Sequence, residues 1–151
     1  MITLQQEKFN DYIDEALPLL HQHWKEVAIN QGKIALEIDY GRYYEACNNG
    51  SLKIYTARDG GKLIGYLAMV VTPHLHYMSH KFAMNDVIYV SPGERGKGTA
   101  RDLIRYAENK LKKEGVSVMM INTKNHKPFD PLLEKLDFSL QDKLYSKYIG
   151  D

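Results

Sequence analysis

The chain has 151 residues, of which 44% are hydrophobic and 26% are charged, and its net charge at pH 7 is +1. This length and composition fit one globular domain covering residues 1–151, and they exclude a disordered chain. The near-neutral charge argues against a protein that binds nucleic acid duplexes, because such proteins gain most of their affinity by neutralising phosphates. A local basic site is still allowed.

The sequence shows no sign of secretion or membrane insertion. Its longest apolar run, Leu67–Val71, is far shorter than the about 20 residues of a membrane-spanning helix. The first residues are polar and acidic, whereas a signal peptide needs a basic start and an apolar run. The single cysteine, Cys47, cannot form an internal disulfide and suits a reducing compartment. We therefore expect a cytoplasmic protein.

The N-terminal third is predicted to be helical. Apolar residues recur at helical spacing between residues 7 and 28, which predicts an amphipathic helix that is bent or broken near Pro18. A shorter helix over residues 40–49 should end at Gly50, because glycine readily adopts the left-handed conformation that terminates helices.

Strands follow the helices. Two β-type runs are joined by Asp59, Gly60 and Gly61, the strongest hairpin signal in the chain. The second run is apolar on both faces, as a central strand should be. A polar, histidine-rich connection over residues 74–81 leads to a further strand from about Phe82 to Val90.

The last third alternates helices and strands. It is predicted to contain a helix over residues 99–114, a buried strand over 116–122, a short helix over 128–136 and a closing strand over 143–149. The whole order predicts a mixed central sheet with helices on both faces, an α/β or α+β fold in three layers.

A glycine-rich loop separates the strand that ends at Val90 from the helix that begins at Thr99. A nucleotide P-loop would need glycine in place of Ser91 and Ser or Thr in place of Gly98. A dinucleotide motif would need glycine in place of Arg101. Both patterns fail, yet glycines at the positive end of a helix expose backbone amides and form a site for pyrophosphate. The alternative is a plain turn with its cations in solvent.

The loop and the preceding Tyr-Val-Ser-Pro resemble the signature segment of the GNAT superfamily of acyl-CoA-dependent N-acyltransferases, through Arg95, Gly98 and Ala100. The chain is most similar to short GNAT-like proteins of phage and bacterial origin. This resemblance implies a three-layer fold with a splayed cleft, acetyl-CoA as donor, a primary amine of a small molecule or protein as acceptor, and a possible homodimer. The residues that it implies for coenzyme A binding are Ile88, Tyr89, Val90, Arg95, Gly96, Lys97, Gly98, Thr99, Ala100 and Asn122.

The resemblance also implies an acidic residue on the strand before the loop. Asp86 is the candidate, four residues before Val90 and on the same strand face by alternation, although it could equally be an exposed or capping aspartate. The segment "LLEKLDF" resembles a later family motif, but Leu133 stands where a tyrosine often protonates the leaving thiolate, and Asp137 replaces a glycine. The acid would then be another group, such as Tyr145, or water.

The remaining cluster consists of His74, His76 and His80. His76 could act as a base or simply face solvent. His74 and His76 form a His-x-His pair, but no third ligand lies at a recognisable spacing from them. Because acyl transfer also needs no metal, we predict no metal site. By the resemblance, tyrosines of the second helix would line the acceptor site. The alternative function is a non-catalytic binding module that keeps the fold.

Overall fold

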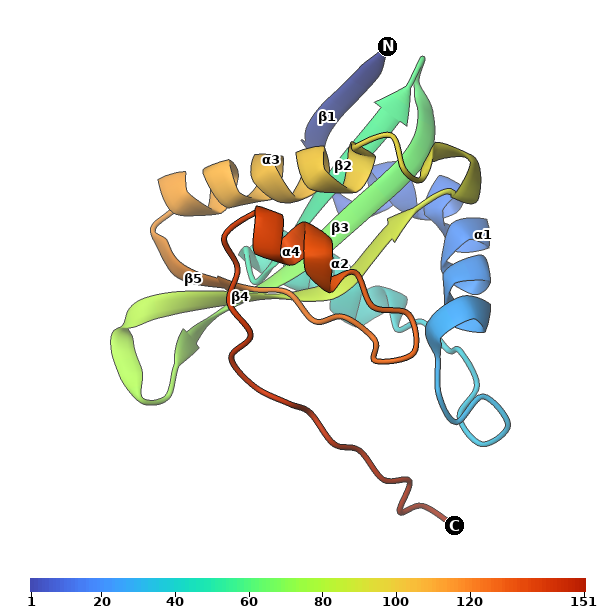
Figure 1. The fold of residues 1–151 in the computed structure, drawn as a ribbon, viewed down its shortest axis with the longest axis vertical. Coiled ribbons are helices and arrows are strands. Elements are labelled where there is room, and N and C mark those ends of the chain that lie inside the picture. The colour runs from blue at the N-terminus through green and yellow to red at the C-terminus, as the bar shows by residue number, and fades with distance from the viewer.

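The computed structural model describes all residues from 1 to 151 and consists of a five-stranded sheet with helices on both faces (Figure 1). The strands lie in the order β1 (Ile2–Glu7), β2 (Leu52–Asp59), β3 (Lys62–His74), β4 (Tyr77–Val90) and β5 (Val116–Met120). The helices are α1 (Phe9–Val27), α2 (Tyr40–Asn49), α3 (Thr99–Lys113) and α4 (Asp130–Lys135), and a 3-10 turn, η1, covers Pro92–Glu94. The first three strand pairs are antiparallel and β4–β5 is parallel. This confirms the predicted mixed sheet in three layers.

Two cores hold the layers together, one on each face of the sheet. Helix α1 buries residues at i, i+3, i+4 and i+7, namely Phe9, Tyr12, Ile13 and Ala16, against one face. Helix α3 buries a matching stripe, which includes Leu103, Ile104 and Leu111, against the other face. Burial of each large side chain contributes about 1.5–3 kcal/mol. None of the helices is long and apolar enough to cross a membrane.

Strand β1 was not expected from the sequence, since "ITLQQE" is mostly polar. It pairs with β2 along its whole length, from Ile2 opposite Asp59 to Glu7 opposite Ile54. Glu7 Oε2, at the C-terminal end of β1, forms a 2.9 Å ion pair with Arg58 Nε, and both side chains are at most 12% exposed. This ion pair holds the end of β1 against β2. Strand β1 therefore forms because β2 offers it an edge to pair with, and not because its own sequence favours a strand.

The prediction of a polar connection over residues 74–81 is wrong. Strand β3 extends to His74 and β4 begins at Tyr77, so residues 74–81 form the tip of a long hairpin that projects from the body of the domain (Figure 1). Aromatic packing supports the tip, with His74 and Phe82 ring centroids 4.6 Å apart. Helix α1 is continuous through Pro18, so of the expected bend or break the break does not occur.

The expected closing strand over residues 143–149 is also wrong. No strand follows α4, and β5 is the last strand of the sheet. The chain after α4 passes β5 and then runs away from the domain to the C-terminus (Figure 1). The helix before it ends as expected, because Asp137 takes the left-handed conformation with a φ of 66°.

Candidate functional site

The sheet forks between β4 and β5. Their parallel pairing stops at Met84 opposite Met120, whereas β4 continues to Val90 beside β3 alone. Two asparagines bridge the fork: the Asn122 N–H donates to Asn85 Oδ1 at 2.6 Å, and Asn85 Nδ2 donates to the Asn122 carbonyl at 3.4 Å. The splayed cleft is thus present, with Asn122 at its apex.

The open edge of β4 presents the peptide groups of Ile88 and Val90. The Ser91 N–H donates to the Ile64 carbonyl at 2.8 Å, and peptide groups alternate in direction along an antiparallel strand. Those of Tyr89 therefore face β3, while its ring is buried beneath α1. The expectation that Tyr89 offers backbone groups to a ligand is corrected accordingly.

A β-bulge places Asp86. Ala68 lies opposite Val87 but Met69 lies opposite Asn85, so that Asp86 is an extra residue in β4. Such a bulge interrupts the alternation of side chains. Asp86 consequently faces the α2 side of the sheet, whereas Val90 packs in the α3 core. The two do not share a face, contrary to the expectation from spacing alone.

Tyr43 of α2 fixes the carboxylate of Asp86. Its hydroxyl donates a hydrogen bond to Asp86 Oδ2, and its ring stacks on Phe9 with centroids 5.5 Å apart. Burial raises the pKa of Tyr43, and the neighbouring Asp86 carboxylate raises it further. Tyr43 therefore stays protonated as a donor. The family resemblance implied that the tyrosines of this helix line the acceptor site, but the sequence gave no signal of the pairing between Tyr43 and Asp86.

The glycine loop exposes backbone amides at the start of α3. Gly96 and Gly98 have φ values of 80° and 88°, and no protein acceptor lies in hydrogen-bond geometry with the amides of residues 96–101. The Thr99 hydroxyl, on a residue only 3% exposed, also lacks a protein partner. Unpaired amides and a buried hydroxyl at the positive end of a helix fit an anionic group such as pyrophosphate.

The cations of the loop are arranged differently from expectation. The Arg95 side chain turns away from the amides: Nε donates to the Val90 carbonyl at 2.8 Å, and another guanidinium nitrogen pairs with Glu26 of α1 at 2.9 Å. Lys97 pairs with Glu94 at 3.4 Å on the surface. Arg101, which the sequence analysis did not select, lies over Gly98, where an added Cβ would be 2.7 Å from its guanidinium.

The other candidates lie outside the cleft. His76 is at the tip of the β3–β4 hairpin, roughly 30 Å from Asp86 along an extended strand. Tyr145 is 86% exposed in the segment after α4. Leu133 is buried against the α3 core. No group of three or more His, Cys, Asp or Glu side chains is placed to hold a metal ion.

Comparisons with known proteins agree with this geometry. Residues 15–138 match the model of the acetyltransferase (GNAT) family. The fold resembles a GCN5-related N-acetyltransferase from Ralstonia eutropha JMP134, with a TM-score of 0.80, 16% identity and coverage of 99% of this chain and 100% of that one.

Two other solved structures are similar. A ribosomal-protein-alanine N-acetyltransferase from Brucella melitensis biovar Abortus 2308 gives a TM-score of 0.75 and 21% identity, with 99% and 100% of the two chains covered. A predicted acetyltransferase with acetyl-CoA from Clostridium acetobutylicum gives 0.73 and 17%, with 98% and 96% covered. No match was found among curated proteins. Because the family model matches most of its length, the chain belongs to the GNAT acetyltransferase family.

Proposed function

We propose that the protein transfers an acetyl group from acetyl-CoA to a primary amine of a small molecule or protein. The observation that carries this proposal is the open edge of β4, which leads directly into the unpaired amides before α3. The β4 side of the cleft can thus bind the extended pantetheine arm of acetyl-CoA, and the amides at the end of the cleft can bind the pyrophosphate. The Clostridium acetobutylicum neighbour, solved with acetyl-CoA, supports this donor.

The donor would be held mainly by backbone groups. The peptide groups of Ile88 and the N–H of Val90 would pair with the pantetheine arm, because the Val90 carbonyl already accepts from Arg95. The amides of residues 96–100 and the Thr99 hydroxyl would bind the pyrophosphate. Asn122 would contact the arm at the apex of the cleft. When bound, acetyl-CoA supplies an acyl group activated as a thioester. An acetyl donor and the half-buried, unpaired Cys47 both suit the cytoplasm, where we place this activity.

Asp86 would prepare the amine. Deprotonation of a lysine-like amine at pH 7 costs roughly 4–5 kcal/mol, given an ordinary pKa of about 10.4. Tyr43 occupies one carboxylate oxygen, Oδ2, and leaves the other free to accept the amine proton, directly or through water. The Ile88 N–H, on the open edge nearby, would stabilise negative charge on the acyl oxygen.

Leu133 stands at the position where the family resemblance led us to expect a tyrosine that protonates the leaving thiolate. Its side chain is buried and has no proton to donate. Tyr145 is too exposed in this arrangement to replace it. A cysteine thiol has an ordinary pKa of about 8.5, so thiolates are good leaving groups, and we infer that water protonates the leaving thiolate in place of a tyrosine.

Replacing Gly98 tests the donor site. Gly98→Trp forces a side chain into a position with a φ of 88° and into contact with Arg101, so we expect at least 100-fold weaker acetyl-CoA binding by isothermal titration calorimetry. Gly93→Ala is the matched control, because a Cβ there meets nothing within 4 Å. Equal affinity in the two variants, with both folded by circular dichroism, would refute the site.

Leu133 also keeps a second function open, a module that binds the donor without catalysis. Screening amines, peptides and proteins by mass spectrometry after incubation with acetyl-CoA separates the two functions. Acetylation of an acceptor that the Asp86→Ala variant no longer modifies would remove the binding-only function. Donor binding without acetylation of any acceptor would support it.

A further inference from the structure

We propose that the tip of the β3–β4 hairpin, residues 72–82, binds an acidic segment of another protein and takes one large apolar side chain of that segment into a groove beside β5. We call the contact region the hairpin surface. It consists of Leu75, Tyr77, Met78, Phe82 and Val118. The inference does not depend on the donor site or on the acceptor of the acetyl group.

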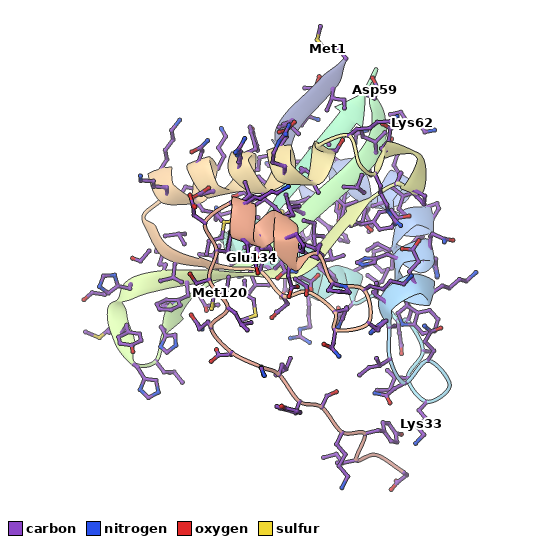
Figure 2. The ribbon with its side chains drawn as sticks, viewed as in Figure 1. Met1, Lys33, Asp59, Lys62, Met120 and Glu134 are labelled. Carbon is purple, nitrogen blue, oxygen red and sulfur yellow. The ribbon has the colours of Figure 1, made fainter.

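The hairpin exposes apolar side chains at its tip. Leu75 is fully exposed, Met78 is 88% exposed and Tyr77 is 55% exposed. Figure 2 shows the side chains of the tip extending to both sides of the hairpin, with no helix over them. Single exposed apolar residues are ordinary, but a cluster of them on one projecting element indicates an interaction surface.

A preformed groove lies behind the tip. It has a volume of about 300 Å³ and is lined by Tyr77, Phe82, Val118, His80 and Ser117. The rings of Tyr77 and Phe82 are stacked, with centroids 5.9 Å apart, and His80 Nδ1 lies 2.8 Å from Ser117 Oγ. The groove is therefore held by contacts among its own residues. Its volume is at the lower end of the range for small-molecule pockets and suits one large side chain of a peptide better than a cofactor.

No helix covers the groove. Ala83 is buried in the α3 core, so Phe82, the residue before it, points to the opposite face of the sheet. The core on that opposite face, to which α1 contributes, includes neither Phe82 nor Val118. The apolar side chains of the groove thus have no partner within the chain, and a segment of another protein can reach them from solvent.

The charge around the hairpin favours an acidic partner. Residues 72–82 contain no Asp or Glu, but they contain Lys81 and three histidines. The last turn of α3 lies at the same end of the molecule (Figure 1) and adds Lys110, Lys112 and Lys113. None of these four lysines is in an ion pair, because the lysines that form one are Lys53, with Glu114, and Lys97. Complementary charge would attract and orient an acidic segment.

The same features favour a protein over nucleic acid or a lipid surface. Nucleic acid binding depends on many cations that contact phosphates, whereas the groove is lined by apolar side chains and contains no Lys or Arg. A bilayer could receive the side chains of the tip, but it cannot fill a groove that lies behind the tip on one face of the sheet. An acidic segment with one apolar anchor uses the tip, the groove and the lysines together.

Binding of defined peptides tests the hairpin surface. The probe is a fluorescein-labelled peptide of aspartates and glutamates around one tryptophan, and fluorescence anisotropy with the full chain should give a Kd in the micromolar range. Two matched peptides should bind at least tenfold more weakly, one with lysines in place of the acidic residues and one with glycine in place of the tryptophan. Absence of probe binding, or equal binding of either matched peptide, would overturn the proposal.

Substitutions at exposed positions locate the contact without disturbing the fold. Leu75→Asp combined with Met78→Asp should weaken probe binding at least tenfold, since both side chains are exposed in the free protein and would repel an acidic segment. Lys112→Glu combined with Lys113→Glu should also weaken it. Ile34→Asp is the matched control, because Ile34 is 53% exposed on the connection between α1 and α2, and it should bind the probe as the wild type does. Wild-type affinity in the Leu75→Asp, Met78→Asp variant would overturn the proposal.

Nuclear magnetic resonance and vesicles separate the other sites and partners. The probe should shift the amide signals of residues 74–82 and 116–118 and leave those of the glycine loop, residues 95–100, unchanged. Shifts confined to the glycine loop or to α2 would contradict the assignment to the hairpin. In sedimentation with vesicles of phosphatidylcholine and phosphatidylserine, the protein should stay in the supernatant. Sedimentation that the Leu75→Asp, Met78→Asp variant loses would replace the protein partner with a lipid surface and overturn the proposal.

Discussion

Asp86 owes its position to one extra residue in β4 and its orientation to one tyrosine. The bulge turns its carboxylate toward α2, where the Tyr43 hydroxyl holds one oxygen. In the proposed mechanism Asp86 is the base and Tyr43 is a positioning residue, since Tyr43 contacts the carboxylate of Asp86. The contributions of the two side chains are therefore separable by mutation.

Asp86→Asn should lower kcat by about 10²–10⁴-fold, the usual contribution of a general base, with little change in acetyl-CoA affinity. Tyr43→Phe keeps the ring stacked on Phe9 but removes the hydrogen bond, and we expect about a tenfold loss. Steady-state kinetics with an identified acceptor, together with calorimetry for the donor, measure both effects. A Tyr43→Phe enzyme as slow as Asp86→Asn would contradict the assigned roles.

The elements differ in how far local sequence determines them. The β2–β3 hairpin, α2 and α3 follow from turn residues and apolar spacing within the element itself. Strand β1, in contrast, is polar and exists because β2 offers an edge, with Glu7 paired to Arg58. The closing strand was expected from its strand-like residues, but a strand also needs a partner, which local sequence does not reveal. The bulge at Asp86 depends on the register against β3 in the same way.

The Glu7–Arg58 pair should make β1 sensitive to acid. Burial alone would raise the pKa of Glu7, but hydrogen bonds from Arg58, Gln5 and Thr56 outweigh burial and lower the pKa below its ordinary value of 4.5. A carboxyl whose pKa is lowered by folding contributes stability above its unfolded pKa and loses it as the pH falls through its folded pKa.

Glu7→Gln should therefore lower Tm at pH 7, and the difference from wild type should shrink as the pH falls below about 4.5. Glu15→Gln is the control, because Glu15 pairs with the same arginine but its side chain is 49% exposed, and exposed pairs contribute little. Thermal unfolding followed by circular dichroism between pH 3 and about pH 7 measures the effect. A difference that grows toward low pH would contradict it.

For the whole molecule, the sequence says more about the proposed donor than about the acceptor. The loop motif is local, so its residues alone distinguished it from two nucleotide motifs. The proposed acceptor side would be built from α1, α2 and the bulged part of β4, which are distant in sequence. The orientation of Arg95 could not be predicted from local sequence either. Its partner Glu26 lies 69 residues away, and this pairing turns the Arg95 side chain away from the loop.

Donor binding should stabilise the whole fold. A ligand present at 100 times its Kd stabilises the native state by about 2.7 kcal/mol, which for a domain of this size corresponds to a Tm increase of roughly 5–10 °C. We expect this increase with acetyl-CoA in a thermal shift assay. NAD is the control ligand, since it shares the adenosine and pyrophosphate but lacks the pantetheine arm, and it should raise Tm by clearly less than acetyl-CoA does. An equal shift with both ligands would contradict a role for the open β4 edge.

The two contacts that tie the site to the N-terminal helices also determine when the site can form. Tyr43 meets Asp86 across 43 residues of sequence and Glu26 meets Arg95 across 69, and contacts between distant residues must offset the entropy of closing long loops. During synthesis, Glu26 and Tyr43 emerge long before their partners. The complete site therefore cannot exist until β4 and the glycine loop have been made and the helices have docked, which ties the onset of activity to completion of the fold.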